Sequence, residues 1–199
     1  MDSLSIQRTA VVGAGTMGNG IAHVLALAGY DVALVDLNGD VLDAATSTIA
    51  SNLDRQVDKD RIDADDRDRA LDRLRPTPDT ADGVADADLV VEAVSETQDV
   101  KQTVFAELDR HAPDHAILAS NTSSISITWL AAQTERPEQV IGMHFFNPVP
   151  VMRLVEIVRG QRTTDATFEA VDELARDLGK EPVEGEDYPG FVSNRILMP

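Results

Sequence analysis

The chain has 199 residues, carries a net charge of −18 and contains no cysteine, while 43% of its residues are apolar. This composition allows a buried core in one large domain, and the charge argues against broad binding to nucleic acid or to anionic membranes. The lack of cysteine excludes disulfides, thiolate catalysis and zinc–thiolate sites. Because no apolar run reaches membrane-spanning length and the start does not read as a signal peptide, we expect a cytoplasmic protein.

The first forty residues predict a strand, a helix and a second strand. Residues 9–12 form a short apolar run, and from Thr16 onward apolar residues recur at the three- and four-residue spacing of a helix. Gly29 is placed to end that helix, and residues 31–36 show the pattern of a second strand. A strand, a helix and a strand in this order predict two parallel strands with a right-handed crossover.

The rest of the chain continues to alternate between helix and strand. Helices are predicted over residues 42–57, 60–75, 100–110, 125–132 and 166–178, and strands over residues 89–94, 116–119, 140–143 and 152–158. This alternation predicts an α/β fold with a doubly wound, mostly parallel sheet of the Rossmann type, into which the first two of these helices are inserted as a pair.

A glycine-rich turn joins the first predicted strand to the first predicted helix. It fits the pattern G-x-G-x-x-G with the residues Gly13, Ala14, Gly15, Thr16, Met17 and Gly18. In such a turn the first glycine allows the tight bend, the second lets the backbone approach a pyrophosphate, and the third lets helix and strand pack closely. Asp36 ends the second strand, where a carboxylate can accept both hydroxyls of an adenine ribose and would repel a 2′-phosphate. The sequence therefore predicts NAD rather than NADP; the alternative is that these residues serve only packing and helix capping.

Three later segments are polar where a buried strand would not need polar side chains. Residues 120–124 and 144–148 each follow a predicted strand, and Glu156 lies inside an apolar one. Because ligands of open α/β sheets gather beyond the carboxyl ends of the strands, these side chains could converge on a nicotinamide. Taken separately, His144 could equally be a core histidine and Glu156 a solvent-facing residue.

Together these segments resemble the L-3-hydroxyacyl-CoA dehydrogenase family, which includes the 3-hydroxybutyryl-CoA dehydrogenases. The resemblance rests on Gly13–Gly18, Ser120–Ser124 (SNTSS), His144–Glu156 (HFFNPVPVMRLVE) and Pro189–Arg195 (PGFVSNR). It runs from about Thr9 to the last residue. It implies NAD-dependent oxidation of a (S)-3-hydroxyacyl-CoA to the 3-oxoacyl-CoA, in fatty acid β-oxidation or butanoate metabolism.

The resemblance also implies roles for residues of the reacting centre. His144 would take the hydroxyl proton while hydride passes to NAD, and Glu156 would pair with His144. Ser123 and Asn194 would hold and polarise the substrate oxygen. A histidine titrates near neutrality and a carboxylate on its other nitrogen fixes the tautomer, so the chemistry agrees with these roles.

Further residues would lie along the two large ligands. The resemblance places Glu96, Lys101, Ser123 and Asn147 along the ribose and nicotinamide side of NAD. It also gives the helical pair a part in binding coenzyme A, for which Lys59 is the candidate residue. The sequence leaves open whether the charges of this pair bind coenzyme A or only pair with one another in solvent.

The family has a second, all-helical domain that closes over the acyl chain and forms a homodimer. We therefore expect an NAD-binding domain over residues 1–187, with residues 188–199 as a linker and the start of a largely absent helical domain. Two alternatives remain. The chain could be an NAD-binding fragment without catalysis of its own, or a hydroxyisobutyrate-type dehydrogenase; the second is weak because those enzymes use a catalytic lysine and only three lysines are present.

Two other features receive simpler interpretations. His111 and His115 have the spacing of metal ligands on a helix, but Pro113 lies between them, so we predict a surface turn and no metal. The 35 acids comprise 24 Asp and 11 Glu, and the bases include only 3 Lys. Such a surface resembles that of proteins from salt-loving organisms, in which salt screens the repulsion between like charges. An ordinary acidic protein is the alternative.

Overall fold

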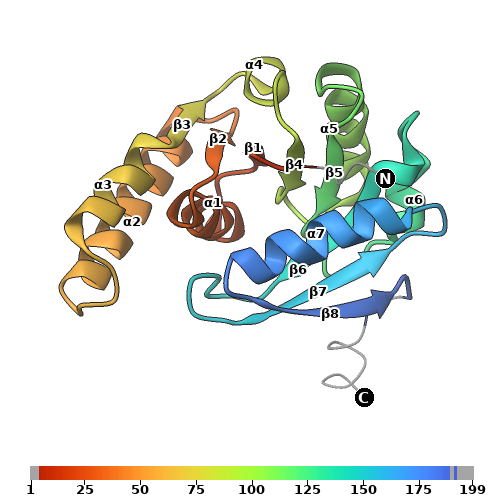
Figure 1. Ribbon diagram of the computed structural model, residues 1–199. Coiled ribbons are helices and arrows are strands. Elements are labelled where there is room, and N and C mark those ends of the chain that lie inside the picture. The colour runs from red at the N-terminus through yellow and green to blue at the C-terminus, as the bar shows by residue number, and fades with distance from the viewer. Residues whose placement is uncertain (1–4, 189–190, 192–199) are drawn as a thin grey trace.

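The computed structural model describes residues 5–188 and 191, which form a single eight-stranded sheet with helices on both faces (Figure 1). The order across the sheet is β3-β2-β1-β4-β5-β6-β7-β8. The strands are β1 (Arg8–Val12), β2 (Asp31–Val35), β3 (Leu74–Thr77), β4 (Leu89–Glu92), β5 (Ile117–Ser120), β6 (Val140–Phe145), β7 (Leu154–Arg159) and β8 (Glu181–Glu186). The helices are α1 (Thr16–Ala28), α2 (Gly39–Val57), α3 (Ala64–Asp72), α4 (Thr80–Val84), α5 (Gln98–His111), α6 (Ile127–Ala131) and α7 (Asp165–Asp177), with a 3-10 turn at Pro137–Gln139.

The sheet is parallel from β3 through β6. β7 pairs antiparallel with β6, and β8 runs parallel to β7. The chain order reverses at β1, which lies between β2 and β4, and ligands of doubly wound sheets bind in the crevice that opens at such a reversal. The predicted doubly wound, mostly parallel fold is confirmed.

Each face of the sheet has its own core because alternate strand residues point to opposite sides. Val11 of β1 packs with Ile21 of α1 and Val171 of α7 on one face. Val12 packs with Phe105 of α5 and other residues of α4 to α6 on the opposite face. Because β1 to β6 pair in parallel, their carboxyl ends lie at one common end of the sheet.

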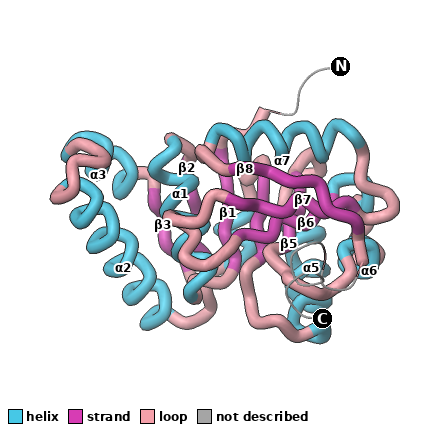
Figure 2. The backbone as a smooth tube through the Cα atoms, turned by 90° about the horizontal axis from the view of Figure 1, so that it is seen from below, coloured by secondary structure: helices cyan, strands magenta, loops and turns pink. Residues whose placement is uncertain are grey.

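The predicted helical pair is present as α2 and α3, which extend beyond the sheet next to β3 (Figures 1 and 2). The Asn38 side chain caps α2 by accepting the amide hydrogen of Asp40, and Asp63 forms a capping box with Asp66 at the start of α3. The pair is joined to α1 through His23, a buried residue whose Nε2 lies 2.8 Å from Nε2 of Gln56.

The second helix of the pair is shorter than predicted. The sequence favoured one helix over residues 60–75, but α3 covers only Ala64–Asp72, and Leu74–Thr77 forms β3 at the edge of the sheet. This strand was not predicted because its charged residue and Pro76 are untypical of a strand. An edge strand tolerates a proline because one side of its backbone has no partner strand.

Two further elements were not predicted, and one was predicted too short. α4 follows β3, and β8 has the sequence EPVEGE, whose charges, proline and glycine are typical of a protected sheet edge rather than of a strand interior. β6 extends to Phe145, so His144 lies within the strand rather than after it. Pairing with β7 supplies the hydrogen bonds that extend β6.

Candidate active site

The turn between β1 and α1 has different requirements at its three glycines. Gly13 has φ +99°, and a Cβ there would lie 2.7 Å from the carbonyl oxygen of Ala93. A Cβ on Gly18 would lie 1.7 Å from the carbonyl oxygen of Gly13, whereas a Cβ on Gly15 would meet no atom within 4 Å. The fold itself thus requires Gly13 and Gly18, while Gly15 keeps a space open in front of α1.

That space lies at a helix N-terminus that can receive an anion. Gly15 is the N-cap of α1, no side chain caps the helix, and its first turn contains no acidic residue. Gly15 and Thr16 are exposed. Unpaired amide groups and the positive end of the helix dipole favour a phosphate here, so the turn fits the pyrophosphate of a dinucleotide.

Asp36 follows β2 and faces this turn. Its Oδ2 accepts the amide hydrogen of Ala14 at 2.9 Å, and its Oδ1 accepts that of Asn38 at 3.0 Å. Each carboxylate oxygen can accept more than one hydrogen bond, so ribose hydroxyls can still be bound. The cap of α2 is Asn38, not Asp36, which removes helix capping as the explanation for this carboxylate. Leu37, which the sequence reading did not single out, follows it with 84% of its surface exposed.

His144 and Glu156 face each other across two strands. They are direct partners in the antiparallel register of β6 and β7, and His144 Nδ1 lies 2.7 Å from Glu156 Oε2. Both residues are buried, and the imidazole lies beside the rings of Phe146 and Phe191, at 4.6 and 6.0 Å between centroids. When the neutral imidazole donates its Nδ1 hydrogen to the carboxylate, the lone pair on Nε2 can accept a proton.

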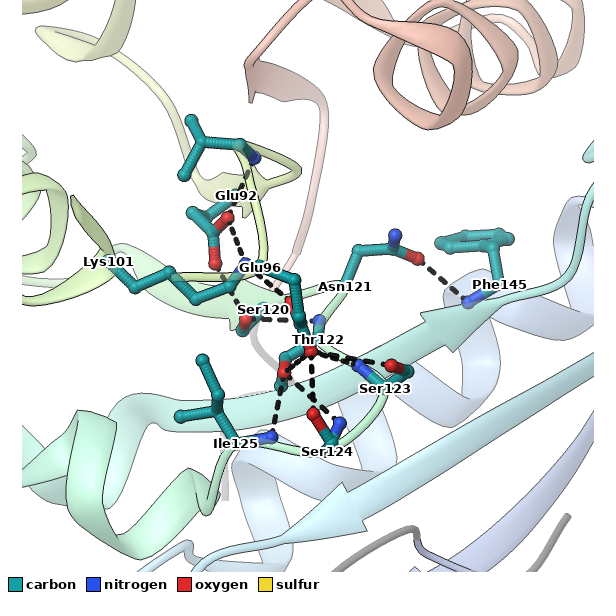
Figure 3. Close-up of polar contacts among 11 residues, drawn as sticks. Glu92, Glu96, Lys101, Ser120, Asn121, Thr122, Ser123, Ser124, Ile125 and Phe145 are labelled. Carbon is teal, nitrogen blue, oxygen red and sulfur yellow. Dashed lines mark hydrogen bonds and ion pairs between the residues drawn. The ribbon is translucent and has the colours of Figure 1, made fainter. Parts of the chain in front are cut away.

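The turn after β5 is held by Glu96 (Figure 3). Glu96 Oε1 accepts hydrogen bonds from the hydroxyl of Thr122 at 2.5 Å, the amide of Ser123 at 2.9 Å and the hydroxyl of Ser124 at 3.2 Å. Burial raises the pKa of Glu96, but the Thr122 hydroxyl, the charge of Lys101 and the Ser123 amide outweigh it, so this pKa lies below its usual value. Glu96 is therefore ionised near neutral pH and fixes the position of Ser123.

Lys101 lies beneath Glu96 rather than at the surface of the site. It is 1% exposed, and its ammonium group contacts Glu92 at 2.6 Å and Glu96 at 3.3 Å. Asn147 is exposed in the loop after β6, where a cis peptide joins it to Pro148. Asn194 lies outside the described residues.

Lys59 lies at a hollow between the helical pair and the loop after β6. The hollow is lined by Asn52, Arg55, Gln56, Lys59, Arg61, Pro148, Pro150 and Val151. Arg55 and Arg61 were not singled out from the sequence. They line the same hollow as Lys59, so three cationic residues lie close to the loop that carries Asn147.

The two histidines with metal-like spacing lie apart from this site. His115 Nε2 is 3.1 Å from Asp88, and His111 Nε2 is 3.4 Å from Glu107 at the end of α5. In the part of the chain that the structure describes, no group of three potential metal ligands occurs, and no helix has the length and apolar character needed to cross a membrane.

Comparisons with known proteins identify the family to which this fold belongs. Residues 8–188 match the family model described as 3-hydroxyacyl-CoA dehydrogenase, NAD binding domain. A 3-hydroxybutyryl-CoA dehydrogenase of Bradyrhizobium diazoefficiens is 51% identical over 98% of this chain and 66% of its own length. The crystal structure of the (S)-3-hydroxybutyryl-CoA dehydrogenase of Ralstonia eutropha has a TM-score of 0.94 at 47% identity, over 97% of this chain and 68% of that one. The 3-hydroxyadipyl-CoA dehydrogenase of Escherichia coli is 44% identical over 98% of this chain and 41% of its own length.

The fold and the glycine turn define an NAD-binding domain of an oxidoreductase. The chain belongs to the 3-hydroxyacyl-CoA dehydrogenase family, and NAD is the cofactor of the domain that it matches. This membership favours the 3-hydroxyacyl-CoA dehydrogenase interpretation over the hydroxyisobutyrate-type dehydrogenase. The chain spans about two thirds of the length of the Bradyrhizobium and Ralstonia relatives.

Proposed function

We propose that this chain carries the NAD site and the acid–base pair for the oxidation of a 3-hydroxyacyl-CoA to a 3-oxoacyl-CoA. The observation that supports it most is the buried contact between His144 and Glu156, 2.7 Å long, at the same edge of the sheet as the glycine turn. When bound, NAD supplies the hydride acceptor. The residues of this chain would bind NAD and the substrate, orient them toward each other and transfer the hydroxyl proton.

The cofactor would be held at both of its ends. Gly15 and the amides of α1 would bind the pyrophosphate, and Asp36 would accept hydrogen bonds from the adenine ribose. Leu37 is exposed next to Asp36 and offers an apolar surface to the adenine ring. Ser123, Asn147 and the ionised Glu96 would lie along the nicotinamide half.

His144 would move the proton. In the oxidation direction its Nε2 takes the hydroxyl proton as the carbon loses hydride, and Glu156 stabilises the imidazolium that forms. In the reverse direction the same nitrogen returns the proton to the oxygen. Ser123 and Asn194 would donate hydrogen bonds to the oxygen as it gains negative charge.

The coenzyme A end would lie against the helical pair. Its phosphates carry negative charge, and Arg55, Lys59 and Arg61 share one hollow there. Three cations on one hollow make this part of an otherwise strongly acidic chain the most suitable for an anionic ligand. We also propose a cytoplasmic location and, for full-length members of the family, a homodimer.

The test is turnover by the 199-residue chain with a matched pair of histidine variants. NADH consumption is followed with acetoacetyl-CoA in molar salt for the wild type, His144→Gln and His115→Gln, the latter an exposed histidine outside the site. We expect His144→Gln to lose about 10²–10⁴ in rate while still binding NADH, and His115→Gln to match the wild type. NADH binding without wild-type turnover would support a fragment that lacks catalysis, and a fully active His144→Gln would refute the proposed base.

A further inference from the structure

A buried pair of opposite charges lies beneath the turn that carries Ser123. Glu92 is the last residue of β4 and Lys101 is on α5; their side chains are 0% and 1% exposed, and Lys101 Nζ lies 2.6 Å from Glu92 Oε1. Burying either charge alone would be unfavourable, because an unpaired ion loses its hydration without compensation. The pair stands at the reversal point of the sheet, since Glu92 is the register partner of Val12, the residue before Gly13.

From Glu92 one branch of hydrogen bonds reaches the turn through Ser120. Glu92 Oε2 accepts the hydroxyl hydrogen of Ser120 at 2.6 Å, and Ser120 Oγ accepts the amide hydrogen of Thr122 at 3.2 Å. Glu92 Oε1 also accepts the amide hydrogen of Val94 at 2.8 Å. The carboxylate thus ties the ends of β4 and β5 together.

A second branch reaches the same turn through Lys101. Its ammonium group lies 3.3 Å from Glu96 Oε2, while Glu96 Oε1 accepts hydrogen bonds from Thr122 and from the amide of Ser123. Figure 3 shows the two branches meeting at Thr122, from which the Glu96 branch continues to Ser123. Two carboxylates, the fully buried Glu92 and the partly exposed Glu96, therefore share one ammonium group.

The sharing has a consequence for Glu96. Lys101 Nζ lies closer to Glu92, at 2.6 Å, than to Glu96, at 3.3 Å, and Glu96 Oε1 accepts hydrogen bonds from the turn. If Glu92 lost its charge, Lys101 would have only Glu96 as an ionic partner and would draw that carboxylate away from Ser123. If both buried charges were removed together, no unpaired buried charge would remain, but Glu96 would lose the ammonium group at its Oε2 and Ser120 would lose its charged acceptor, so neither branch would hold Ser123 in place.

We infer that Glu92 is a positioning residue for the proposed dehydrogenase reaction, acting through Lys101 and Ser120 to fix Glu96 and Ser123 against the nicotinamide and the substrate oxygen. Glu92 itself does not reach the site. This inference rests on the proposed function, because it assigns Ser123 and Glu96 to the reacting ligands. A merely structural role for Glu92 is the competing explanation.

The test compares Glu92→Gln, the double variant Glu92→Gln/Lys101→Met, and Asp88→Asn. Asp88 is a matched control because it directly precedes β4, at the other end of that strand from Glu92. Its carboxylate accepts the backbone amide hydrogens of Gln7 and Arg8. Thermal unfolding, NADH affinity and turnover with acetoacetyl-CoA are measured for each. In addition, the pH titration of the Glu96 carboxyl is followed by carbon NMR, with Glu96→Gln to assign the signal.

We expect Glu92→Gln to lower the unfolding temperature and to lower kcat about a hundredfold, as displacement of a reacting group by about 1 Å does. The double variant should regain most of the unfolding temperature, because no unpaired charge is left, yet kcat should stay low. Its Glu96 should titrate at a higher pH than in the wild type. Asp88→Asn should lower the unfolding temperature but leave NADH affinity and kcat unchanged.

Recovery of kcat together with stability in the double variant would overturn the inference, as would an unchanged Glu96 titration there. If Glu92→Gln fails to fold, the double variant carries the same comparison. If the wild type binds NADH but does not turn over, the proposed function fails, and the Glu96 titration still decides whether Glu92 and Lys101 control this carboxyl group.

Discussion

Gly15 and Gly18 lie three residues apart in one turn, yet the same added methyl group should act on them in opposite ways. Gly15 has φ −64° and ψ −165°, which alanine adopts freely, and its Cβ would meet nothing within 4 Å. Gly15→Ala should therefore stabilise the fold by about 0.4–1 kcal/mol, because alanine has less freedom to lose on folding. For a chain of this size that corresponds to an unfolding temperature about 1–4 °C higher.

Gly18→Ala should destabilise the fold. Its Cβ would lie 1.7 Å from the carbonyl oxygen of Gly13, and a backbone oxygen cannot rotate away as a side chain can. Forcing a methyl group into such a contact costs about 1–3 kcal/mol, which lowers the unfolding temperature by about 2–12 °C. The sign of the shift thus separates two glycines that look alike in the sequence.

Binding should follow a different order from stability. The methyl group of Gly15→Ala would project into the space that the pyrophosphate must enter, and the loss of a charged hydrogen-bonded contact there is worth about 1.5–3 kcal/mol. The dissociation constant for NADH should rise about tenfold to 150-fold. Fluorescence titration with NADH, beside thermal unfolding in the same buffer, measures both quantities. Wild-type affinity in a stabilised Gly15→Ala variant would refute the assignment of this turn to the pyrophosphate.

Three further predictions follow from charge and burial. Asp36→Ala should weaken NADH binding about tenfold or more and reduce the preference for NADH over NADPH. If a titration gives the same ratio of NADH and NADPH affinities as in the wild type, the role of Asp36 is contradicted. Burial, and then the charge of Lys180, lowers the pKa of His23 to about 4. Because the unfolded chain binds this proton more tightly, stability should fall as pH drops from about 6.5 towards 4, by about 2 kcal/mol at pH 5, and urea unfolding of His23→Gln should show a flatter dependence. The unfolding midpoint should rise between dilute buffer and molar KCl if the charge of −18 is an adaptation to salt, and a constant midpoint would favour an ordinary acidic protein.

The parts of the fold that the sequence predicted are those with a strong local pattern. The βαβ unit around Gly13–Gly18 combines an apolar strand, a glycine turn and an amphipathic helix, and each element was placed within a residue or two of its position. β3 and β8 were missed because edge strands carry charges and proline, so their sequences lack the apolar signal of a buried strand. Only pairing with β2 and β7 makes them strands.

The sequence and its family resemblance suggested residues for the site, and those assignments stay predictions, but the contacts of these residues could not be predicted. Nothing in the spacing of His144 and Glu156 indicated that they are register partners of two antiparallel strands. Lys101 was expected along the cofactor, whereas its ammonium group is buried between two carboxylates. Glu92 was not singled out, because a single acid in an apolar run gives no sign of which residues will surround it.

The pairing of β6 with β7 also bears on how the site would assemble during folding. These strands are joined by residues 146–153, so His144 and Glu156 meet by closing a short loop, which costs little chain entropy. The glycine turn, in contrast, needs contacts such as Gly13 with Ala93, which lie eighty residues apart. The His144–Glu156 pair proposed for proton transfer is therefore formed within one hairpin, whereas the proposed nucleotide site requires distant parts of the chain to come together.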